Sequence, residues 1–276
     1  MTTSSDAIQS VEQLADTWGA LVLDYGSVHA RRVGVQDVPG MAIRWADSRF
    51  GFWNALALTD VNVGPELLRE RLGAAVDYMR GKNHPGFLWV FENLLDPAAR
   101  AGLPEAADQA GLTLGLTGFG MAGDILPLPE PTHPDLRFIR VTNDDELTAY
   151  ADLNSRAYGL PLEDGRDALC GSTFLMSEGH AYLGLVNDVP VSAAATVKSG
   201  DCLFLALVAT APEAQRRGYG EATTRKALFE GAKATGLTRT TLHATLAGAP
   251  VYERIGYRKV ADIGFWTLKQ EHSSTS

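Results

Sequence analysis

The spacing of apolar and polar positions predicts alternating helices and strands along the whole chain. An apolar stripe at helical spacing opens the chain; it consists of Ile8, Val11, Ala15, Trp18 and Val22. Runs of apolar residues then predict strands at 41–47, 52–59, 87–91 and 113–125, with helices that begin at Gly64 and at Asp96. The first half therefore reads as a mixed α/β region.

The second half repeats this alternation over a longer stretch. Apolar runs predict strands at 136–141, 181–186, 191–197, 202–209, 240–245 and 257–268. Helices are expected at 143–158, at the short segment ending near 174, at 218–234 and at 250–255. Asn143 and Glu146 make a capping pair at the start of the first of these helices. This order predicts a mixed sheet whose longest helix follows the fourth strand.

Four prolines between residues 127 and 134 mark the boundary between the halves. Proline fixes φ and lacks an N–H donor, so neither a helix nor a central strand can pass through this segment. We therefore divide the chain into a first region at 1–126, a linker at 127–135, a second region at 136–270 and a disordered tail at 271–276.

Composition and charge narrow the class of protein. The chain has 276 residues, of which 45% are hydrophobic and 21% charged, as in globular proteins. It lacks both an apolar run near the roughly 20 residues of a membrane span and a basic, apolar leader. A net charge of −9 argues against nucleic acid and mildly favours a cationic partner. Cys170 and Cys202 are too few for a zinc site or a disulfide framework, which predicts buried thiols in a reducing cytoplasm and no metal.

The segment Gly118–Gly123 matches the pattern G-x-G-x-x-G of dinucleotide sites. Such a site needs the motif to open a helix, so that the pyrophosphate meets free N–H groups. Here residues 124–127 lead into the proline linker, and no helix can begin. The glycines are therefore expected to relieve crowding in a bent strand.

A second glycine-rich loop has the context that an anion site requires. A buried strand ends at Thr210, and a tight loop turns into the long helix. Gly218 and Gly220 have no Cβ, so a ligand can approach the backbone closely. The N–H groups at a helix start suit a pyrophosphate, and Arg216 and Arg217 add full positive charges. The absence of Gly-Lys-Ser/Thr excludes a P-loop.

This loop resembles motif A of the GCN5-related N-acetyltransferases (GNAT), whose pattern is Gln/Arg-x-x-Gly-x-Gly/Ala. Gln215, Gly218 and Gly220 carry the match, with Pro212 just upstream. The segment 242–257, which ends Tyr-Glu-Arg-Ile-Gly-Tyr, resembles motif B of the same family. One helix and one strand separate the two motifs, as in the family. The resemblance covers the second half and implies the GNAT acyl-CoA acyltransferase fold.

The resemblance also implies roles for individual residues. The acetyl-CoA contacts that it implies are Val208, Ala209, Thr210, Gln215, Arg216, Arg217, Gly218, Tyr219, Gly220 and Thr245. Tyr252 falls on the tyrosine that protonates the departing thiolate of coenzyme A. Thr245 stands where many relatives carry asparagine, and its hydroxyl can still donate to pantetheine or hold a water.

The general base stays open at this point. An amine of pKa about 10 must lose a proton before it attacks a thioester. The fourth strand of the second half carries no carboxylate. The alternatives are Glu163 and Asp164 in the polar turn expected at 161–165 before the short helix, His243, and a water chain that ends on a backbone carbonyl.

The first half has two interpretations. Its order of elements suggests a degenerate GNAT-like repeat that has lost acyl-CoA binding, because Asp60–Pro65 has one glycine and no arginine where motif A would lie. The alternative is an unrelated α/β cap over the acceptor groove. Under both interpretations, two roles are open for Trp45, Phe52 and Trp53: they line the acceptor site or they pack in the core.

The resulting hypothesis is a cytoplasmic acetyltransferase that transfers an acetyl group from acetyl-CoA to a primary amine. The amine belongs to a small molecule or to a protein lysine. The enzyme acts as a monomer or homodimer, without a metal, nucleic acid or membrane. The alternative is a non-catalytic acyl-CoA-binding regulator, which the missing base favours and Tyr252 opposes.

Overall fold

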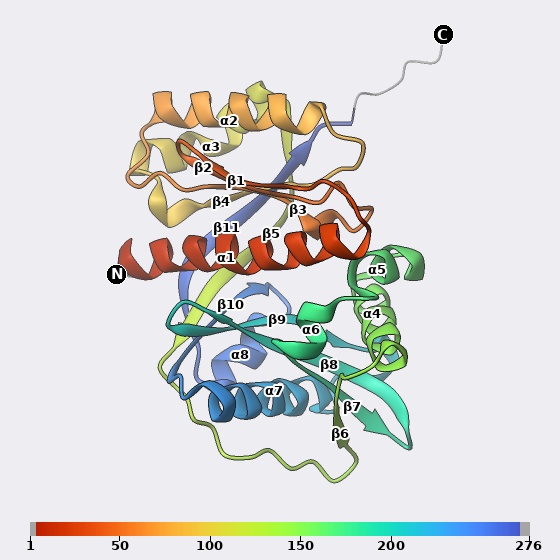
Figure 1. The fold of residues 1–276 in the computed structure, drawn as a ribbon. Helices are drawn as coiled ribbons and strands as arrows, with labels where there is room; N and C mark the ends of the chain where they lie inside the picture. The colour runs from red at the N-terminus through yellow and green to blue at the C-terminus, as the bar shows by residue number, and fades with distance from the viewer. Residues whose placement is uncertain (1–3, 271–276) are drawn as a thin grey trace.

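The computed structural model describes residues 4–270, which build one 11-stranded sheet with helices on both faces (Figure 1). The strand order is β1-β2-β3-β4-β11-β5-β10-β9-β8-β7-β6. The strands are β1 (Gly34–Val38), β2 (Met41–Trp45), β3 (Asn54–Leu58), β4 (Phe87–Phe91), β5 (Leu112–Gly123), β6 (Arg137–Arg140), β7 (His180–Val186), β8 (Val189–Ser199), β9 (Cys202–Thr210), β10 (Arg239–Thr245) and β11 (Arg258–Leu268). The α-helices are α1 (Ser4–Val28), α2 (Pro65–Arg80), α3 (Pro97–Ala110), α4 (Asp144–Tyr158), α5 (Leu162–Leu169), α6 (Thr173–Ser177), α7 (Tyr219–Thr235) and α8 (Ala249–Ile255).

Local signals explain where most helices begin. The side chain of Asp96 accepts a hydrogen bond of 2.6 Å from the amide of Ala99 and so caps α3. Asn143 caps α4 in the same way through the amide of Glu146 at 3.0 Å. The Glu146 carboxylate accepts from the amide of Thr142, one residue earlier than a standard capping box. Residues 124–136 form no helix or strand, as the alternating prolines predict.

The two halves share one order of elements. In the first half, β3 and β4 are parallel and joined by α2, and α3 leads to β5. In the second half, β9 and β10 are parallel and joined by α7, and α8 leads to β11. In both halves an antiparallel pair, β1 with β2 or β7 with β8, precedes this unit. The origin of the first half as a degenerate repeat and the proposed domain boundaries stay predictions.

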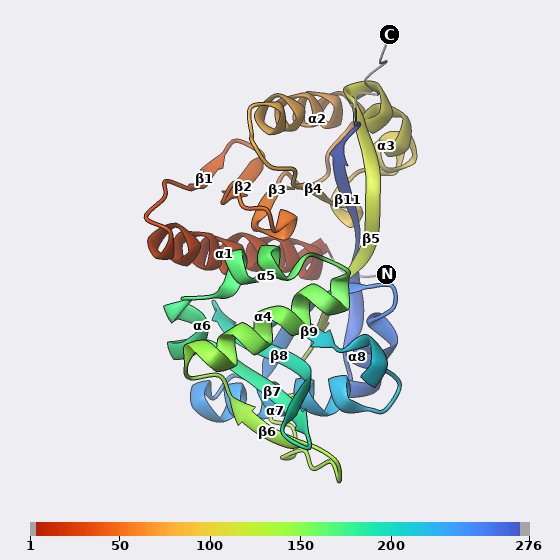
Figure 2. The ribbon, with the colours of Figure 1, turned by 90° about the vertical axis from the view of Figure 1, so that its right-hand side faces the viewer.

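The halves exchange their last strands. β5 from the first half lies between β10 and β11, and β11 from the second half lies between β4 and β5. His243 of β10 is opposite Gly120 of β5, and Phe265 of β11 is opposite Trp89 of β4. Figure 2 shows β5 and β11 running side by side from one half into the other. Each half therefore completes its sheet with backbone from the other.

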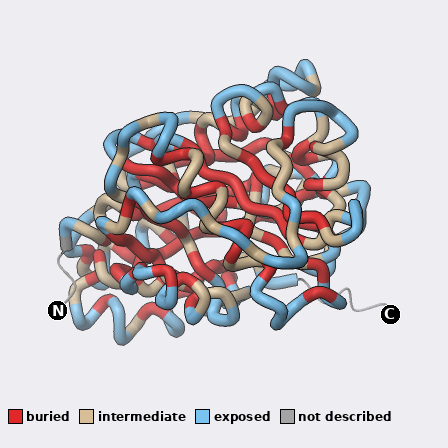
Figure 3. The backbone as a smooth tube through the Cα atoms, turned by 90° about the horizontal axis from the view of Figure 1, so that it is seen from below, coloured by how far each residue is buried: buried red, intermediate tan, exposed pale blue. Residues whose placement is uncertain are grey.

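Helix α1 crosses one face of the sheet where the halves meet (Figure 1). Its buried residues, including Leu14 and Trp18, join one core cluster with Trp53 of the first half and Phe204 of the second. Helices α2 and α3 cover the opposite face in the first half, and α7 and α8 cover it in the second. Buried residues run through the centre of the molecule, and exposed residues lie mostly around its rim (Figure 3). Within residues 4–270 no helix is both long and apolar enough to cross a membrane.

Most of the expected elements are present, with differences at the edges. The stripe from Ile8 to Val22 belongs to α1, and 113–125 is the long strand β5. The edge strand β1 was not predicted, because its residues are half-buried or exposed and carry no clear alternation. The turn expected before the short helix is itself helical, forming α5. The predicted tail at 271–276 lies outside the described residues.

The glycines of the G-x-G-x-x-G segment lie in β5, as expected from the proline that follows them. A Cβ added at Gly118 would lie 2.5 Å from the carbonyl oxygen of Ala244 in β10. Such a contact is closer than packed atoms allow. Gly118 therefore permits β5 to lie against β10, and the motif is structural.

Replacing Gly118 by alanine should lower the free energy of unfolding by about 1–3 kcal/mol, because β5 or β10 must shift. Gly102 in α3 is the matched control, since a Cβ there meets nothing within 4 Å. Gly102→Ala should raise stability by about 0.5–1 kcal/mol through helix propensity. Urea denaturation of both variants measures the difference. Equal stability of Gly118→Ala and the parent would contradict the close approach.

Candidate functional site

The site lies where the parallel strands β9 and β10 separate. Their register runs from Cys202 opposite Arg239 only as far as Leu205 opposite Leu242. Beyond this point β10 continues along β5 to Thr245, whereas β9 remains paired with β8. The backbone groups of β9 that face β10 are thus left without a strand partner. A free strand edge can bind an extended chain through its amides and carbonyls.

A bulge in β9 and two tyrosines from α4 hold this split open. The register between β8 and β9 shifts after Ala206, and Leu207 adopts a φ of +53°. This left-handed conformation is costly for a residue other than glycine. The hydroxyl of Tyr150 donates to the carbonyl of Leu207 at 2.8 Å. The hydroxyl of Tyr158 donates to the carbonyl of Val208 at 3.1 Å. Val208, Ala209 and Thr210 follow directly on the bulge.

The loop from Gln215 to Gly220 leads into α7 beside the split. Arg216 and Gly218 both have positive φ, at +62° and +81°. No side chain caps α7, so the first amides of the helix are free to bind an anion. Arg216 and Arg217 are exposed, and neither forms an ion pair with another of the residues 4–270. The loop therefore has the geometry and the charge that a pyrophosphate requires.

The two glycines of this loop serve different purposes. Gly218 is needed for its left-handed φ, and the nearest side-chain atom to a Cβ there belongs to His133 at 3.6 Å. A Cβ at Gly220 would lie 2.5 Å from the hydroxyl oxygen of Thr210, so Gly220 lets α7 pack on β9. Tyr219 is 4% exposed, and its ring faces His133 of the linker. Only the backbone of Tyr219 is therefore available to a ligand.

Tyr252 lies in α8 on the other side of the split. Its side chain is 9% exposed and lines the cavity between β9 and β10. Burial raises the pKa of Tyr252 well above its ordinary value of 10.0, and the neighbouring Tyr158 and Tyr257 add to the shift. The phenol therefore keeps its proton at neutral pH. Thr245 ends β10, where its hydroxyl accepts a hydrogen bond from the amide of Gly248 at 3.1 Å and stays free to donate.

The cavity has a volume of about 100 Å³, and most of its ring residues belong to the core on the face of the sheet that α1 covers. We call it the aromatic chamber. Its ring-bearing walls include Trp18, Phe50, Trp53, Trp89, Phe204 and Phe265. Phe52 and Trp53 line it, and Trp53 also packs in the core. Trp45 lies on the opposite face against Tyr78, so it packs in the core.

His243 lines the same chamber and is a poor candidate for the base. Its Nε2 lies 3.1 Å from both the carbonyl oxygen and the hydroxyl oxygen of Ser10. A protonated Nε2 donates to the carbonyl and a bare Nε2 accepts from the hydroxyl, so these contacts allow either neutral tautomer. Burial among rings lowers the pKa of His243 to about 4. The imidazole is thus neutral at pH 7 and binds a further proton weakly.

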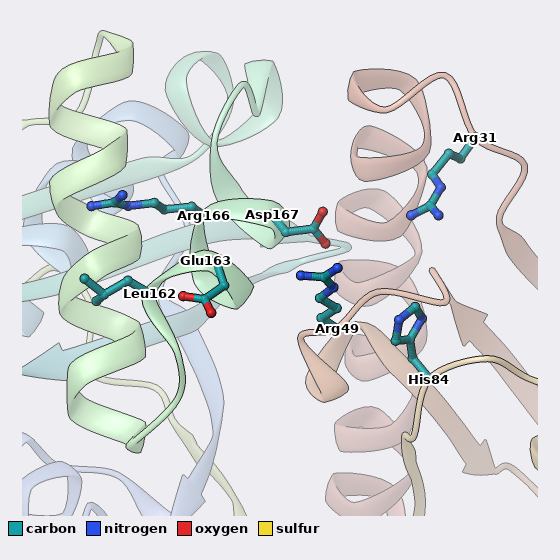
Figure 4. A pocket seen from close by; sticks show the side chains of 7 residues that line it. All are labelled: Arg31, Arg49, His84, Leu162, Glu163, Arg166 and Asp167. Atoms are coloured by element: carbon teal, nitrogen blue, oxygen red, sulfur yellow. The ribbon is translucent and has the colours of Figure 1, made fainter.

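The carboxylate candidates lie elsewhere. Glu163 lines a wider cleft of about 690 Å³ between α5 and the first half, together with Arg31, Arg49 and Asp167 (Figure 4). Arg166 at the same cleft pairs with Asp152 through contacts of 2.7 and 2.8 Å. Asp164 lines neither cavity. No Asp or Glu lines the aromatic chamber among the described residues. Residues 4–270 hold no group of three or more side chains placed to bind a metal.

Part of the second half is similar to a known protein family. Residues 171–265 match the family model described as an acetyltransferase (GNAT) domain. This match lies within the second half of the chain and includes both motifs. This confirms the resemblance of the two motifs, and it accounts for the uncapped helix beside an opened pair of parallel strands. The family is one of acetyltransferases, which supports acyl transfer as the class of reaction.

Solved structures show that the whole fold recurs. A GCN5-related N-acetyltransferase from Kribbella flavida has a TM-score of 0.65 at 17% identity, over 92% of this chain and 96% of that chain. An N-acetyltransferase-like protein from Streptococcus suis has a TM-score of 0.52 at 14% identity, over 96% and 100%. A GCN5-related N-acetyltransferase from Sphaerobacter thermophilus has a TM-score of 0.54 at 13% identity, over 82% and 75%. No curated protein sequence matches the chain.

The buried His243 should make stability depend on pH. Its pKa is about 4 when folded and 6.5 when unfolded, so the unfolded chain binds this proton more readily. This contribution to the free energy of unfolding is complete above pH 6.5 and is lost as the pH falls through 4. His243→Leu should flatten the corresponding part of the stability profile. Urea titrations between pH 4 and 7 measure this, and unchanged slopes in His243→Leu would refute it.

Proposed function

We propose that the chain transfers an acetyl group from acetyl-CoA to a primary amine at the split between β9 and β10. One observation carries the proposal: a free strand edge, an uncapped helix start with two unpaired arginines, and a buried protonated tyrosine meet at this split. The GNAT match over residues 171–265 supports the same reaction class. Action in the cytoplasm, as a monomer or homodimer, belongs to the proposal.

Each part of the donor has a suitable partner at the site. The pyrophosphate is bound by the amides from Gln215 to Gly220 and by Arg216 and Arg217. The pantetheine arm pairs with the free backbone edge from Val208 to Thr210, and Thr245 donates to it from the opposite strand. The thioester then lies at the split, where a backbone N–H polarises its carbonyl oxygen.

The chemistry is a direct transfer within a ternary complex. The amine nitrogen attacks the thioester carbon, a C–N bond forms, and the C–S bond breaks. The amine loses one proton to a base or to water, and the sulfur leaves as a thiolate that accepts a proton. The products are an N-acetylamine and the free thiol of coenzyme A.

Tyr252 donates a hydrogen bond to the leaving sulfur. Because its pKa is raised, it stays protonated throughout the neutral range and can always donate. A thiol with a pKa of about 8.5 is the stronger acid of the two, so complete transfer from this phenol is uphill. The hydroxyl acts mainly by donating a hydrogen bond as negative charge develops on sulfur.

A water molecule is the proton acceptor that fits these surroundings best. His243 is too weak a base, and no described carboxylate lines the chamber. Water at the split can pass the proton to bulk solvent or to a backbone carbonyl. The same observation favours the alternative function, a regulator that binds acyl-CoA without turnover.

Turnover separates the two functions. The assay follows release of the coenzyme A thiol from acetyl-CoA with a panel of small amines and lysine peptides as acceptors. Transfer to any acceptor, confirmed by the mass of the product, supports the enzyme. Tight acetyl-CoA binding without transfer to any member of the panel would favour the regulator.

Tyr252→Phe keeps the packing of the ring and removes the donor. Loss of general acid catalysis costs roughly 10²–10⁴-fold in rate. The loss should appear in kcat, since the hydroxyl matters most as charge develops on sulfur. Tyr257→Phe is the matched control, because Tyr257 bonds to Thr240 in the core of the second half. A Tyr252→Phe enzyme that turns over at the parent rate under chemistry-limited conditions would show that the tyrosine only packs.

Replacing Arg216 and Arg217 together by glutamine should weaken acetyl-CoA binding about 10- to 100-fold, as expected for charge-assisted contacts to phosphate. Acetyl-pantetheine, which lacks the pyrophosphate, should bind the double variant and the parent equally. Arg137→Gln is the control, an exposed arginine outside the loop that pairs with Asp188. Calorimetry gives all three affinities. Equal losses for both donors would place the pyrophosphate elsewhere.

A further inference from the structure

The aromatic chamber and the body of helix α7 lie on opposite faces of the sheet. Helix α7, whose start forms the loop, packs on one face with Leu203 and Leu205. Trp18, Trp53 and Phe204 of the chamber belong to the core on the other face. The split between β9 and β10 is the passage between them. A donor anchored at α7 therefore leaves the chamber open to a second reactant.

The walls of the chamber are rings set edge to face. Trp18 meets Trp53 at a centroid distance of 6.0 Å, Trp89 at 5.5 Å and Phe204 at 5.8 Å, with interplanar angles of 80°, 68° and 89°. Edge-to-face packing is the arrangement that aromatic pairs prefer, and it suits a further ring. The volume of about 100 Å³ is of the order that holds one ring, since an apolar cavity of about 150 Å³ binds benzene.

Two buried polar atoms on the walls lack a partner. The indole N–H of Trp89, a residue 2% exposed, donates to nothing among the described residues. Nδ1 of His243 is likewise unpaired, and it donates or accepts according to the tautomer of the ring. Buried polar groups are normally satisfied. Both rings line the chamber, with their centroids 5.3 Å apart, so a polar group on a ligand in the chamber can pair with one of these atoms.

We propose that the aromatic chamber receives the aromatic ring of a small acceptor amine, so that the first half of the chain determines acceptor specificity. This inference rests on the proposed acetyl transfer and adds the class of acceptor. The ring lies among Trp18, Trp53 and Trp89, and the amine reaches the thioester at the split. A polar substituent on the ring pairs with the Trp89 N–H or with Nδ1 of His243.

The chemistry of the walls disfavours other occupants. A polyamine carries further ammonium groups, and no described carboxylate lines the chamber to receive them. The body of a lysine peptide is far larger than the cavity and leaves it empty. A long acyl chain on the donor is the strongest rival, but an alkyl chain leaves both buried polar atoms unpaired.

Binding to the coenzyme A-saturated protein tests the proposal without requiring turnover. The probes are 2-phenylethylamine and tyramine, compared with n-propylamine as an amine without a ring. Calorimetry should give a Kd for each aromatic probe at least 10-fold below that of n-propylamine. A smaller ratio for both aromatic probes would overturn the proposal.

Two substitutions on the same strand test the chamber, one that fills it and a matched one outside it. Leu116 of β5 is half-buried and lines the chamber, whereas Leu114 on the same strand is 46% exposed and does not. Leu116→Trp should weaken binding of the aromatic probes at least 10-fold and leave the affinity for coenzyme A unchanged. Leu114→Trp should leave both unchanged. Leu116→Phe, with a smaller ring, replaces Leu116→Trp if that variant does not fold.

The outcomes separate the chamber from acetyl transfer itself. Aromatic probes that bind Leu116→Trp as tightly as the parent would overturn the proposal. An affinity for octanoyl-CoA more than 10-fold above that for acetyl-CoA, lost in Leu116→Trp, would overturn it in favour of an acyl pocket. Ring binding that Leu116→Trp abolishes, without turnover of any amine, would support the chamber and contradict acetyl transfer.

Discussion

Each half of the chain completes its sheet with the last strand of the other half, and the rest of the structure depends on this exchange. β11 lies between β4 and β5, and β5 lies between β11 and β10. The backbone ladder is continuous across the junction, so neither half can move away without breaking strand pairs inside a buried sheet. The exchange also fixes Trp89 and Leu116 of the first half beside the split in the second.

The split arises because β9 and β10 follow different neighbouring strands beyond Leu205 and Leu242. β8 pairs with β9 to its end, whereas β10 turns away along β5 after Leu242. The bulge at Leu207 absorbs the difference, and the hydroxyls of Tyr150 and Tyr158 satisfy the carbonyls that the bulge displaces. An opening in a sheet normally exposes unpaired backbone at a cost. In the proposed reaction that backbone edge binds the donor, and the helix start of α7 supplies the adjacent anion site.

The two faces of the sheet have different roles in the proposed reaction. The α7 face carries charge and free amides for a phosphorylated donor. The α1 face carries rings that come from both halves of the chain. Burial acts in opposite senses on the two titratable groups near the split. It holds Tyr252 protonated, because the raised pKa disfavours the phenolate, and it holds His243 neutral, because the lowered pKa disfavours the imidazolium.

Local sequence signals predicted much of the fold and the loop from Gln215 to Gly220 that leads into α7. The caps at Asp96 and Asn143 and the helix start after Gly218 are encoded within a few residues, and each was found where the spacing placed it. The strand exchange was not predictable, because it depends on which distant strands pair and leaves no local pattern. Nothing local told Trp45 from Trp53 either, since the face that each ring occupies depends on the loop between them.

The chamber and the role of Gly220 show the same limit. Rings at Trp18, Phe50 and Trp89 are far apart in the sequence, and only the exchanged sheet brings them together. The spacing of Gly218 and Gly220 suggested one shared purpose, close approach of a ligand. The contact of Gly220 with Thr210 gives it a packing purpose, which only the position of α7 against β9 reveals.

Hydrogen exchange on the intact chain, with and without acetyl-CoA, tests the central claim most directly. The account places the donor along β9 and the start of α7, so amides at 205–222 should exchange more slowly in the complex. The corresponding connection in the first half, residues 59–68 between β3 and α2, should be unaffected. Protection at 59–68 with unchanged exchange at 205–222 would contradict the account.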